Sequence, residues 1–228
     1  RPDTDGMREQ FRMNKSDIEL RNLIDLAYVI QDFETTLNNV EFPITDFKKI
    51  RALKYAAHCE EMRFFAKLST DPQYMSHNYK DVVKDANKIY EMYQSAVHSS
   101  QALIKFSLLC YEMFQMFGKT QDASDFIVRI ALLLNEGHVV KPLLLEQCAF
   151  EFLYLQQFRK FAFYMTLASQ SYRKVEYLDL SDYSFNCMAT VHAFYQSNKG
   201  WNQIKYSLCS KLADGSKKAS DQSAELAI

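Results

Sequence analysis

Apolar residues recur with the spacing of an α-helix along most of this chain. The first such segment follows Ser16, which forms a capping-box pattern with Glu19 three residues later. Beyond it, apolar residues three or four positions apart share one face of a helix: Leu20, Leu23, Ile24, Ala27, Ile30 and Phe33. The pattern predicts a helix over residues 17–32.

Turn-forming residues divide the rest of the chain into further amphipathic segments. We expect a loop around Pro43, a stop at Ser69-Thr-Asp-Pro72, and helix ends before Gly118 and Gly137, while Pro142 stands in the first turn of a helix. The helices predicted between these points cover residues 33–39, 46–68, 75–93, 97–117, 119–135, 141–156 and 157–177. A further helix, capped by Asp179 or Ser181, runs to Ser197, and a last one ends near Ala213. No segment shows the alternation that is typical of a strand.

Three helical segments superimpose when the chain is placed in register at Cys110, Cys148 and Cys187, at intervals of 38 and 39 residues. In each, a polar turn follows eight to twelve residues later and leads into a second amphipathic helix: Gly118-Lys119, Gln156-Gln157 and Asn198-Lys199-Gly200. The pattern indicates a repeated helical hairpin.

An earlier copy of the repeat is indicated at Cys59, which lies 51 residues before Cys110. The longer interval fits one more repeat that carries an insertion of about twelve residues at Thr70 to Asn78. Gly118 followed five residues later by Ala123 resembles the turn of a tetratricopeptide unit, where a small side chain lets two helices approach closely.

The fold predicted from these patterns is all-α: an α-solenoid of antiparallel helical hairpins, tetratricopeptide-like, with a period of about 39 residues. We expect the helical-repeat domain to cover residues 16–213. Residues 1–15 and the polar tail 214–228 are expected to be disordered.

Composition supports this interpretation and narrows the function classes. Five Gly and four Pro in 228 residues are too few for the turns of an all-β chain. The formal charge of −1 gives no basic excess, so we expect no nucleic-acid partner. Short basic clusters are interpreted as solvated helix faces: Lys48, Lys49, Arg51 and Lys54, and Arg159 with Lys160.

The five cysteines are widely spaced and have apolar neighbours, which favours reduced, buried thiols in a cytoplasmic protein. The longest uncharged run, Tyr183 to Asn198, is too short and too polar to span a bilayer. Because the chain begins at Arg1 rather than Met, we expect a fragment, a short isoform or a truncated gene model of a longer protein.

Residues able to carry chemistry are few. His58-Cys59-Glu60-Glu61 contains metal-ligand types, but consecutive helical residues point about 100° apart and cannot close around one ion without distant partners. His192 is interpreted as a hydrogen-bonded histidine between helices rather than a general base. No nucleophile elbow or phosphate-binding glycine loop occurs. The sequence therefore predicts no enzyme, with no catalytic, cofactor-binding or metal residue, and leaves the partner-binding residues unknown.

A series of aromatic residues admits two interpretations. Phe158, Phe161, Phe163, Tyr164 and Tyr172 could line a ligand groove, but helical spacing favours core packing. The segment 158–177 has basic residues near its ends and could also lie on a membrane surface. Packing against neighbouring helices is the preferred interpretation.

Several strings occur in an order that resembles the helical-repeat region of subunit 8 of the transport protein particle (TRAPP). They are Leu23-Ile-Asp-Leu-Ala27, Gln31-Asp-Phe33, Lys54-Tyr-Ala-Ala57, Glu60-Glu-Met62, Leu143-Leu-Leu-Glu-Gln147, Arg159-Lys-Phe-Ala-Phe-Tyr-Met-Thr-Leu-Ala168, Tyr172-Arg-Lys174 and Lys199-Gly-Trp201. The resemblance covers about residues 20–205. The sequence departs from it around Val40 to Phe47, at Tyr164, where the family has a histidine, and after Trp201, where the family continues through further helices.

The resemblance implies a non-catalytic scaffold subunit of a vesicle-tethering complex. That complex acts with Rab1-type GTPases in ER-to-Golgi transport and in autophagy. The implied partners are the other TRAPP subunits and, indirectly, the GTPase. The implied location is cytoplasmic, peripheral on Golgi or ER-Golgi membranes through the complex. The alternative is a generic tetratricopeptide-like adaptor that binds a peptide or a partner helix.

Overall fold

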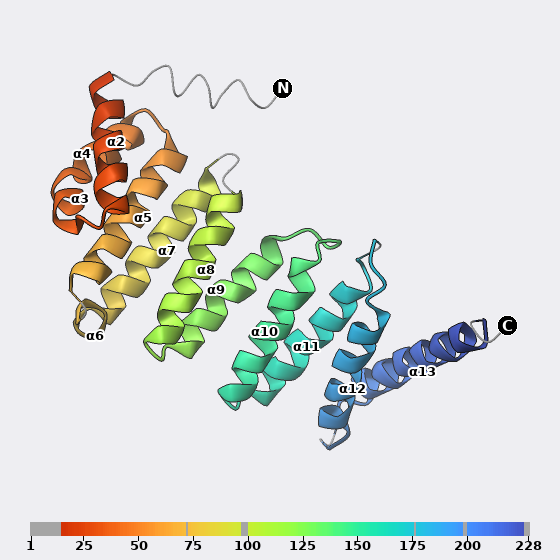
Figure 1. The fold of residues 1–228 in the computed structure, drawn as a ribbon. Helices are drawn as coiled ribbons and strands as arrows, with labels where there is room; N and C mark the ends of the chain where they lie inside the picture. Colours follow the sequence, from red (N-terminus) through yellow and green to blue (C-terminus); the bar gives the residue numbers. More distant parts are fainter. Residues whose placement is uncertain (1–14, 72, 97–99, 176, 198–199, 226–228) are drawn as a thin grey trace. The chain divides into compact units, whose positions relative to one another are not determined.

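The computed structural model describes residues 15–71, 73–96, 100–175, 177–197 and 200–225, and within them all regular secondary structure is α-helical (Figure 1). The predicted all-α class is confirmed. The chain divides between Cys110 and Tyr111 into two compact units. The predicted repeat domain therefore contains two units, which are described separately below.

Unit 1 is built around one long helix, α5, against which α3, α4 and α7 all pack. The helix α2 packs on α3 and α4, and the short α6 lies within the predicted insertion at residues 70–78. Their bounds are α2 Lys15–Val29, α3 Phe33–Asn39, α4 Glu41–Lys49, α5 Leu53–Thr70, α6 Tyr74–His77 and α7 Tyr79–Ser95.

Two expectations for unit 1 are corrected. Pro43 lies inside the first turn of α4 rather than in a loop, because the missing N–H of proline has no helical partner at that position anyway. The helix predicted over residues 46–68 is two helices, α4 and α5, separated at Ile50–Ala52. Arg51 breaks the helix there with a left-handed φ of 60°.

Unit 2 is a succession of helices in which each packs on the next: α9 on α10, α10 on α11, α11 on α12 and α12 on α13. The division between the units falls within α8, and Phe114 of α8 stacks on Phe126 of α9 with ring centroids 5.7 Å apart. Their bounds are α8 Ser100–Met116, α9 Thr120–Leu133, α10 Val140–Tyr154, α11 Phe158–Tyr172, α12 Ser181–Ser197 and α13 Asn202–Glu225.

The predicted repeat is confirmed by the positions of the cysteines. Cys110, Cys148 and Cys187 lie on the first helices of successive hairpins, α8–α9, α10–α11 and α12–α13, and all three side chains are buried. Ala123, predicted to allow a close helix approach, is fully buried on α9. Cys148 and Cys187 belong to one hydrophobic core cluster that joins the successive helices of unit 2.

Only the C-terminal limit predicted for the repeat domain can be compared with the structure. Residues 1–14 lie outside the described residues. At the other end, α13 runs past the predicted boundary at Ala213 to Glu225. This tail is polar, which favours disorder, but its Ala, Lys, Gln and Glu residues are good helix formers. Residues 226–228 lie outside the described residues.

Four helix ends share one hydrogen-bond arrangement, although their sequences differ. After α2, for example, Gln31 N–H donates to the Tyr28 carbonyl and Asp32 N–H to the Ala27 carbonyl, at 3.1 and 2.8 Å. These are the two bonds of a Schellman motif, which needs a left-handed residue at its centre. The central residues are Gln31, Arg51, Gly118 and Gln156, with φ between 58° and 68°.

We expect Gln31→Gly to stabilise the protein by about 0.5–1 kcal/mol, because glycine adopts a positive φ without the steric cost that a Cβ brings. Urea denaturation followed by circular dichroism measures the change. The matched control is Gln94→Gly, at an exposed helical position of α7, which should lose a similar amount. Destabilisation by both substitutions would contradict the left-handed conformation of Gln31.

Candidate functional site

Two adjacent acidic residues of α5, Glu60 and Glu61, are buried. Buried carboxylates are costly unless they are paired, and perturbed carboxylates gather at functional sites. Their partners come from α5 itself and from α4, α7 and α8, and each carboxylate has its own set.

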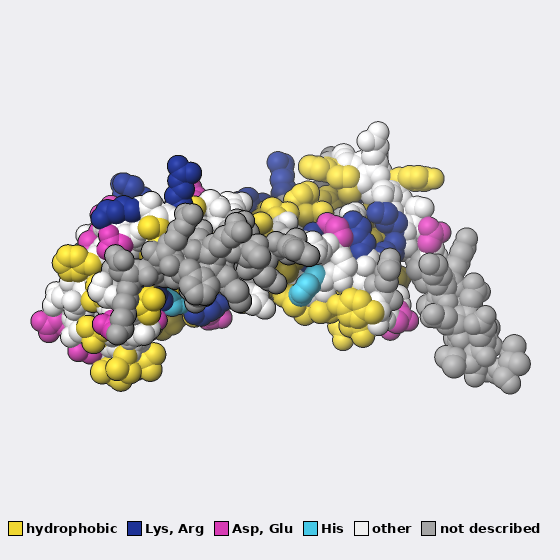
Figure 2. Space-filling model, turned by 90° about the horizontal axis from the view of Figure 1, so that it is seen from above, with side chains coloured by type: hydrophobic (Ala, Val, Ile, Leu, Met, Phe, Trp, Pro, Cys, Tyr) yellow, Lys and Arg dark blue, Asp and Glu magenta, His cyan; other side chains and the backbone are white. Residues whose placement is uncertain are grey.

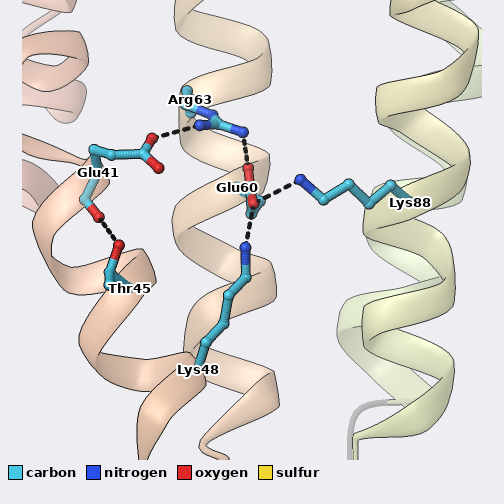
Figure 3. Close-up of polar contacts among 6 residues, drawn as sticks. All are labelled: Glu41, Thr45, Lys48, Glu60, Arg63 and Lys88. Carbon is cyan, nitrogen blue, oxygen red and sulfur yellow. Dashed lines mark hydrogen bonds and ion pairs between the residues drawn. The ribbon is translucent and has the colours of Figure 1, made fainter.

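The Glu60 carboxylate accepts hydrogen bonds from three cations (Figure 3). Lys48 Nζ of α4 lies 2.9 Å and Lys88 Nζ of α7 lies 3.0 Å from Glu60 Oε1, and Arg63 Nη2 contacts Oε2. Arg63 also donates to the exposed Glu41 carboxylate at 2.5 Å. Side chains of three helices therefore meet at one buried carboxylate.

The pKa of Glu60 reflects two opposing causes. Burial by itself raises it, but the hydrogen bonds from Lys48 and Lys88 and the positive charge of Arg63 outweigh burial, so the pKa lies below its ordinary value of 4.5. A carboxylate held ionised by three cations is a poor general acid or base near neutral pH. The cluster acts as a structural clasp between α4, α5 and α7.

Glu61 has a different environment. It accepts a hydrogen bond from the buried Tyr93 hydroxyl of α7, and Lys105 Nζ of α8 lies 3.5 Å from its Oε1. Burial and the nearby negative charge of Glu61 raise the pKa of Tyr93. The tyrosine therefore stays protonated and donates, so this pair also joins helices.

His58 and Cys59 face Arg21 of α2. The Arg21 guanidinium contacts His58 Nδ1 and lies 2.6 Å from Cys59 Sγ. Burial and the charge of Arg21 lower the pKa of His58, and burial raises the pKa of Cys59 to about 11. The guanidinium therefore makes polar contacts with the imidazole and the thiol, and these contacts join α2 to α5.

Residues 58–61 thus have three sets of partners: His58 and Cys59 share Arg21, while Glu60 and Glu61 each contact other side chains. Across the parts of the chain that the structure describes, no three His, Cys, Asp or Glu side chains lie close enough to hold a metal ion. The buried polar groups of α5 contact side chains of neighbouring helices and so position them.

The expectation that all cysteines are buried is wrong for Cys209, which is exposed on α13. Leu208 beside it is buried against α12, and consecutive helical residues point about 100° apart, so Cys209 faces away from the core. Its Sγ lies 3.2 Å from Nε2 of His192, which also contacts Gln196 at 3.3 Å. His192 therefore has the inter-helix partner that the sequence suggested.

We expect iodoacetamide to label one cysteine rapidly in the native protein. Burial raises the pKa of Cys148 and Cys187 to about 12 each, and also raises that of Cys110, so these thiols are protonated as well as inaccessible. Intact-mass spectrometry should show one fast adduct in the native chain and none in Cys209→Ser. Fast labelling of a second site in that variant would contradict the burial.

The aromatic series of α11 is only partly core. Phe161 and Tyr172 are buried, but Phe158 and Phe163 are about half exposed, at 48% and 54%. The core interpretation is therefore wrong for these two residues. Phe163 lies on the side of α11 opposite Phe161 and Tyr172, whereas Phe158 shares their side but stands at the start of the helix. Helical spacing placed aromatics on two faces, and only packing could show which face is covered.

A hollow of about 370 Å³ opens where α10 turns into α11. It is lined by Gln156, Gln157, Phe158, Arg159, Lys160 and Phe194. The basic pair Arg159 and Lys160 therefore borders a concavity rather than a plain helix face. By contrast, Lys48 of the other basic cluster is paired with Glu60, and Lys49 with Asp46 at 2.8 Å.

The outer face of α2 is strongly apolar. One side of the helix packs in the core through Ile24 and Ala27. The other side, together with Ile30 directly after the helix, exposes five large apolar side chains within about 140° of arc: Ile18, Leu23, Leu26, Val29 and Ile30. In the view of Figure 2, hydrophobic side chains gather in several groups on the surface, with Lys and Arg interspersed among Asp and Glu. Surface groups of this kind mark contact sites for other molecules.

None of the described helices combines the length and the hydrophobicity needed to cross a bilayer. The segment 158–177 that we considered for a membrane surface forms α11, whose buried residues pack against α10 and α12.

Comparison with known proteins adds little to the fold. No protein-family model matches the chain, and no curated protein matches it. Similar solved structures include two of nearly identical TPR-like repeats from a putative kinesin light chain of Podosopora anserina, one of them a single-substitution variant.

The similarity to these structures is low. The variant structure is 13% identical with a TM-score of 0.43, covering 92% of this chain and 100% of the other. The second is also 13% identical, with a TM-score of 0.44 and coverage of 90% and 99%. The fold class therefore rests on the described helices themselves, whose repeated hairpins are an architecture suited to an adaptor or a scaffold.

Proposed function

We propose that this chain is a non-catalytic scaffold subunit of a TRAPP-type vesicle-tethering complex. The resemblance of the strings between residues 20 and 205 supports the family, and the repeated hairpins support the role. In this role the chain contacts other subunits, and the complex acts on a Rab1-type GTPase at Golgi or ER-Golgi membranes, in transport and autophagy.

The observation that carries the scaffold role is the outer face of α2. Leu26, Val29 and Ile30 are 60%, 76% and 65% exposed. Covering each such side chain contributes about 1.5–3 kcal/mol at full burial. The neighbouring helices of unit 1 cover the opposite face of α2 with apolar helix surfaces, so a helix of a partner subunit suits the outer face in the same way.

Affinity purification from the source cell with mass spectrometry tests this function. We expect the chain to recover small longin-fold subunits and other TRAPP components. Leu26→Glu should lose them, since it places a charge in the proposed contact. The matched control is Leu132→Glu on α9, because the same residue is 64% exposed there against 60% at Leu26. Absence of TRAPP subunits from a well-expressed wild-type sample would reject the assignment.

A second assay tests whether the chain by itself catalyses nucleotide exchange on a Rab1-type GTPase. The buried titratable groups of α5 are occupied in joining helices, so we expect the purified chain alone to leave the nucleotide-release rate of a Rab1-type GTPase unchanged. Acceleration of release by the chain alone would contradict a purely structural role.

The alternative is a tetratricopeptide-like adaptor that binds a peptide outside any TRAPP complex. The hollow beside Phe158 favours it as a second candidate, because a concave apolar site with polar edges accommodates a peptide side chain. Recovery of partners that share a short linear motif, without TRAPP subunits, would select this alternative.

A further inference from the structure

The hollow at the α10–α11 turn is formed by residues of two sequence regions. The turn supplies Gln156 and Gln157, the first turn of α11 supplies Phe158, Arg159 and Lys160, and α12 supplies Phe194. The hollow has a volume of about 370 Å³ and is open to solvent. All six residues belong to unit 2.

The charged side chains that line this hollow are all positive. Arg159 and Lys160 line it, and none of the other four lining residues is acidic. Lys160 Nζ lies 4.7 Å from the centroid of the Phe152 ring, so it is held by a cation–π contact rather than by a carboxylate. Both side chains are exposed. A negatively charged group in the hollow would therefore find two cations that no acidic lining residue neutralises.

Arg159 and Lys160 also lie at the N-terminal end of α11, where positive charges destabilise a helix. The first turn of α11 is the positive end of its dipole, and acidic residues are the stabilising choice there. The sequence has none in that turn, and no side chain caps the helix. An anion bound beside Arg159 and Lys160 would offset both the repulsion and the uncapped end.

An aromatic wall completes the site. The Phe158 ring stacks on Phe194 with centroids 6.3 Å apart and an interplanar angle of 29°. This contact holds Phe158 in place while about half of its surface stays exposed. An exposed aromatic surface next to two cations is suited to binding an apolar side chain whose neighbours in sequence are acidic.

We propose that this hollow is a docking site for a short acidic peptide segment of a partner protein, in which an apolar or aromatic side chain contacts Phe158 and Phe194 while adjacent carboxylates pair with Arg159 and Lys160. The inference rests on the proposed function in that both treat the chain as a protein-binding scaffold. It commits to a peptide rather than a lipid surface because the site is concave: a side chain enters a hollow, whereas a flat membrane contacts protruding residues.

Selection from a phage-displayed library of random twelve-residue peptides on the immobilised full chain tests the site. We expect the enriched peptides to combine Asp or Glu with a neighbouring Phe, Tyr, Trp or Leu. Fluorescence anisotropy with one labelled enriched peptide then gives a dissociation constant. That constant should rise with salt, because partly exposed charge pairs are screened.

Variants locate the binding. The double change Arg159→Glu with Lys160→Glu should weaken the enriched peptide about tenfold or more, and Phe158→Ala should do the same without removing a charge. The matched control is Lys80→Glu with Lys84→Glu, two exposed lysines on α7 whose reversal alters the net charge by the same amount. Circular dichroism confirms that each variant keeps its helix content.

The possible outcomes test the docking site separately from the scaffold function. Enrichment of peptides without acidic residues, equal weakening by the α7 control, or no enrichment would overturn the docking site. Vesicles containing phosphatidylserine that bind the chain and lose binding on reversal of Arg159 and Lys160 would also overturn it, in favour of a membrane surface. Recovery of TRAPP subunits by both wild type and the Arg159→Glu, Lys160→Glu variant would leave the scaffold function standing in either case.

Discussion

Replacing Phe106 by alanine is expected to lower the free energy of unfolding by about 3–5 kcal/mol. The ring is fully buried in unit 1 and lies 6.3 Å from Phe64, 6.2 Å from Phe65 and 5.9 Å from Tyr93, measured between ring centroids. Alanine would remove the apolar contacts and leave a cavity, since three neighbouring rings on two other helices cannot close it without moving those helices.

Urea denaturation followed by circular dichroism measures this loss. The control is Leu109→Ala, three residues along the same helix, where the side chain is 40% exposed. We expect a change below about 1 kcal/mol there, because much of that surface is in water already. Equal losses at the two positions would mean that Phe106 does not hold α8 against α5 and α7.

Replacing Glu60 by alanine is expected to cost about 2–4 kcal/mol, because the substitution removes charge-assisted hydrogen bonds from Lys48, Lys88 and Arg63. The loss stays below the upper range for a broken buried ion pair because the two lysine side chains are 41% and 48% exposed, so water can solvate them. Thermal and urea unfolding of the full chain measure the difference.

The control for Glu60 is Glu41→Ala, which removes a carboxylate bound to the same arginine but 65% exposed. We expect it to change stability by less than about 1 kcal/mol. The advantage of wild type over Glu60→Ala also depends on pH. Because the pKa of Glu60 is lower in the folded chain, its contribution is full above the ordinary value of 4.5 and is lost as the pH falls below it. A difference that grows on acidification would contradict the clasp.

The buried titratable groups and the proposed binding residues lie in different places. The buried groups, such as Glu60, Glu61 and Tyr93, join helices of unit 1. The cations that border the hollow, Arg159 and Lys160, face a surface instead. The proposed binding residues can therefore be changed with little expected loss of fold, which is what makes the docking test informative.

Several features could be predicted from local sequence because they depend on local physics. Helices follow from apolar residues at helical spacing, and the repeat follows from Cys110, Cys148 and Cys187 at nearly equal intervals. Gly118 predicts a helix end because glycine accepts a positive φ. The equivalent position at Arg51 carries no such signal, so the break between α4 and α5 was missed. There, buried neighbours such as Phe47 and Ala52 hold a conformation that the residue itself does not favour.

The sequence by itself therefore determined the helical class, the hairpin repeat and which helices begin each hairpin, because periodicity and turn chemistry are properties of short segments. Only the tertiary structure decided which faces are covered. Phe158 and Phe161 belong to one helix with the same spacing rules, yet Phe161 is buried and Phe158 borders a hollow. Glu60 and Glu61 likewise received separate partners from distant helices. Burial and pairing depend on residues far apart in the chain, and a local pattern does not contain them.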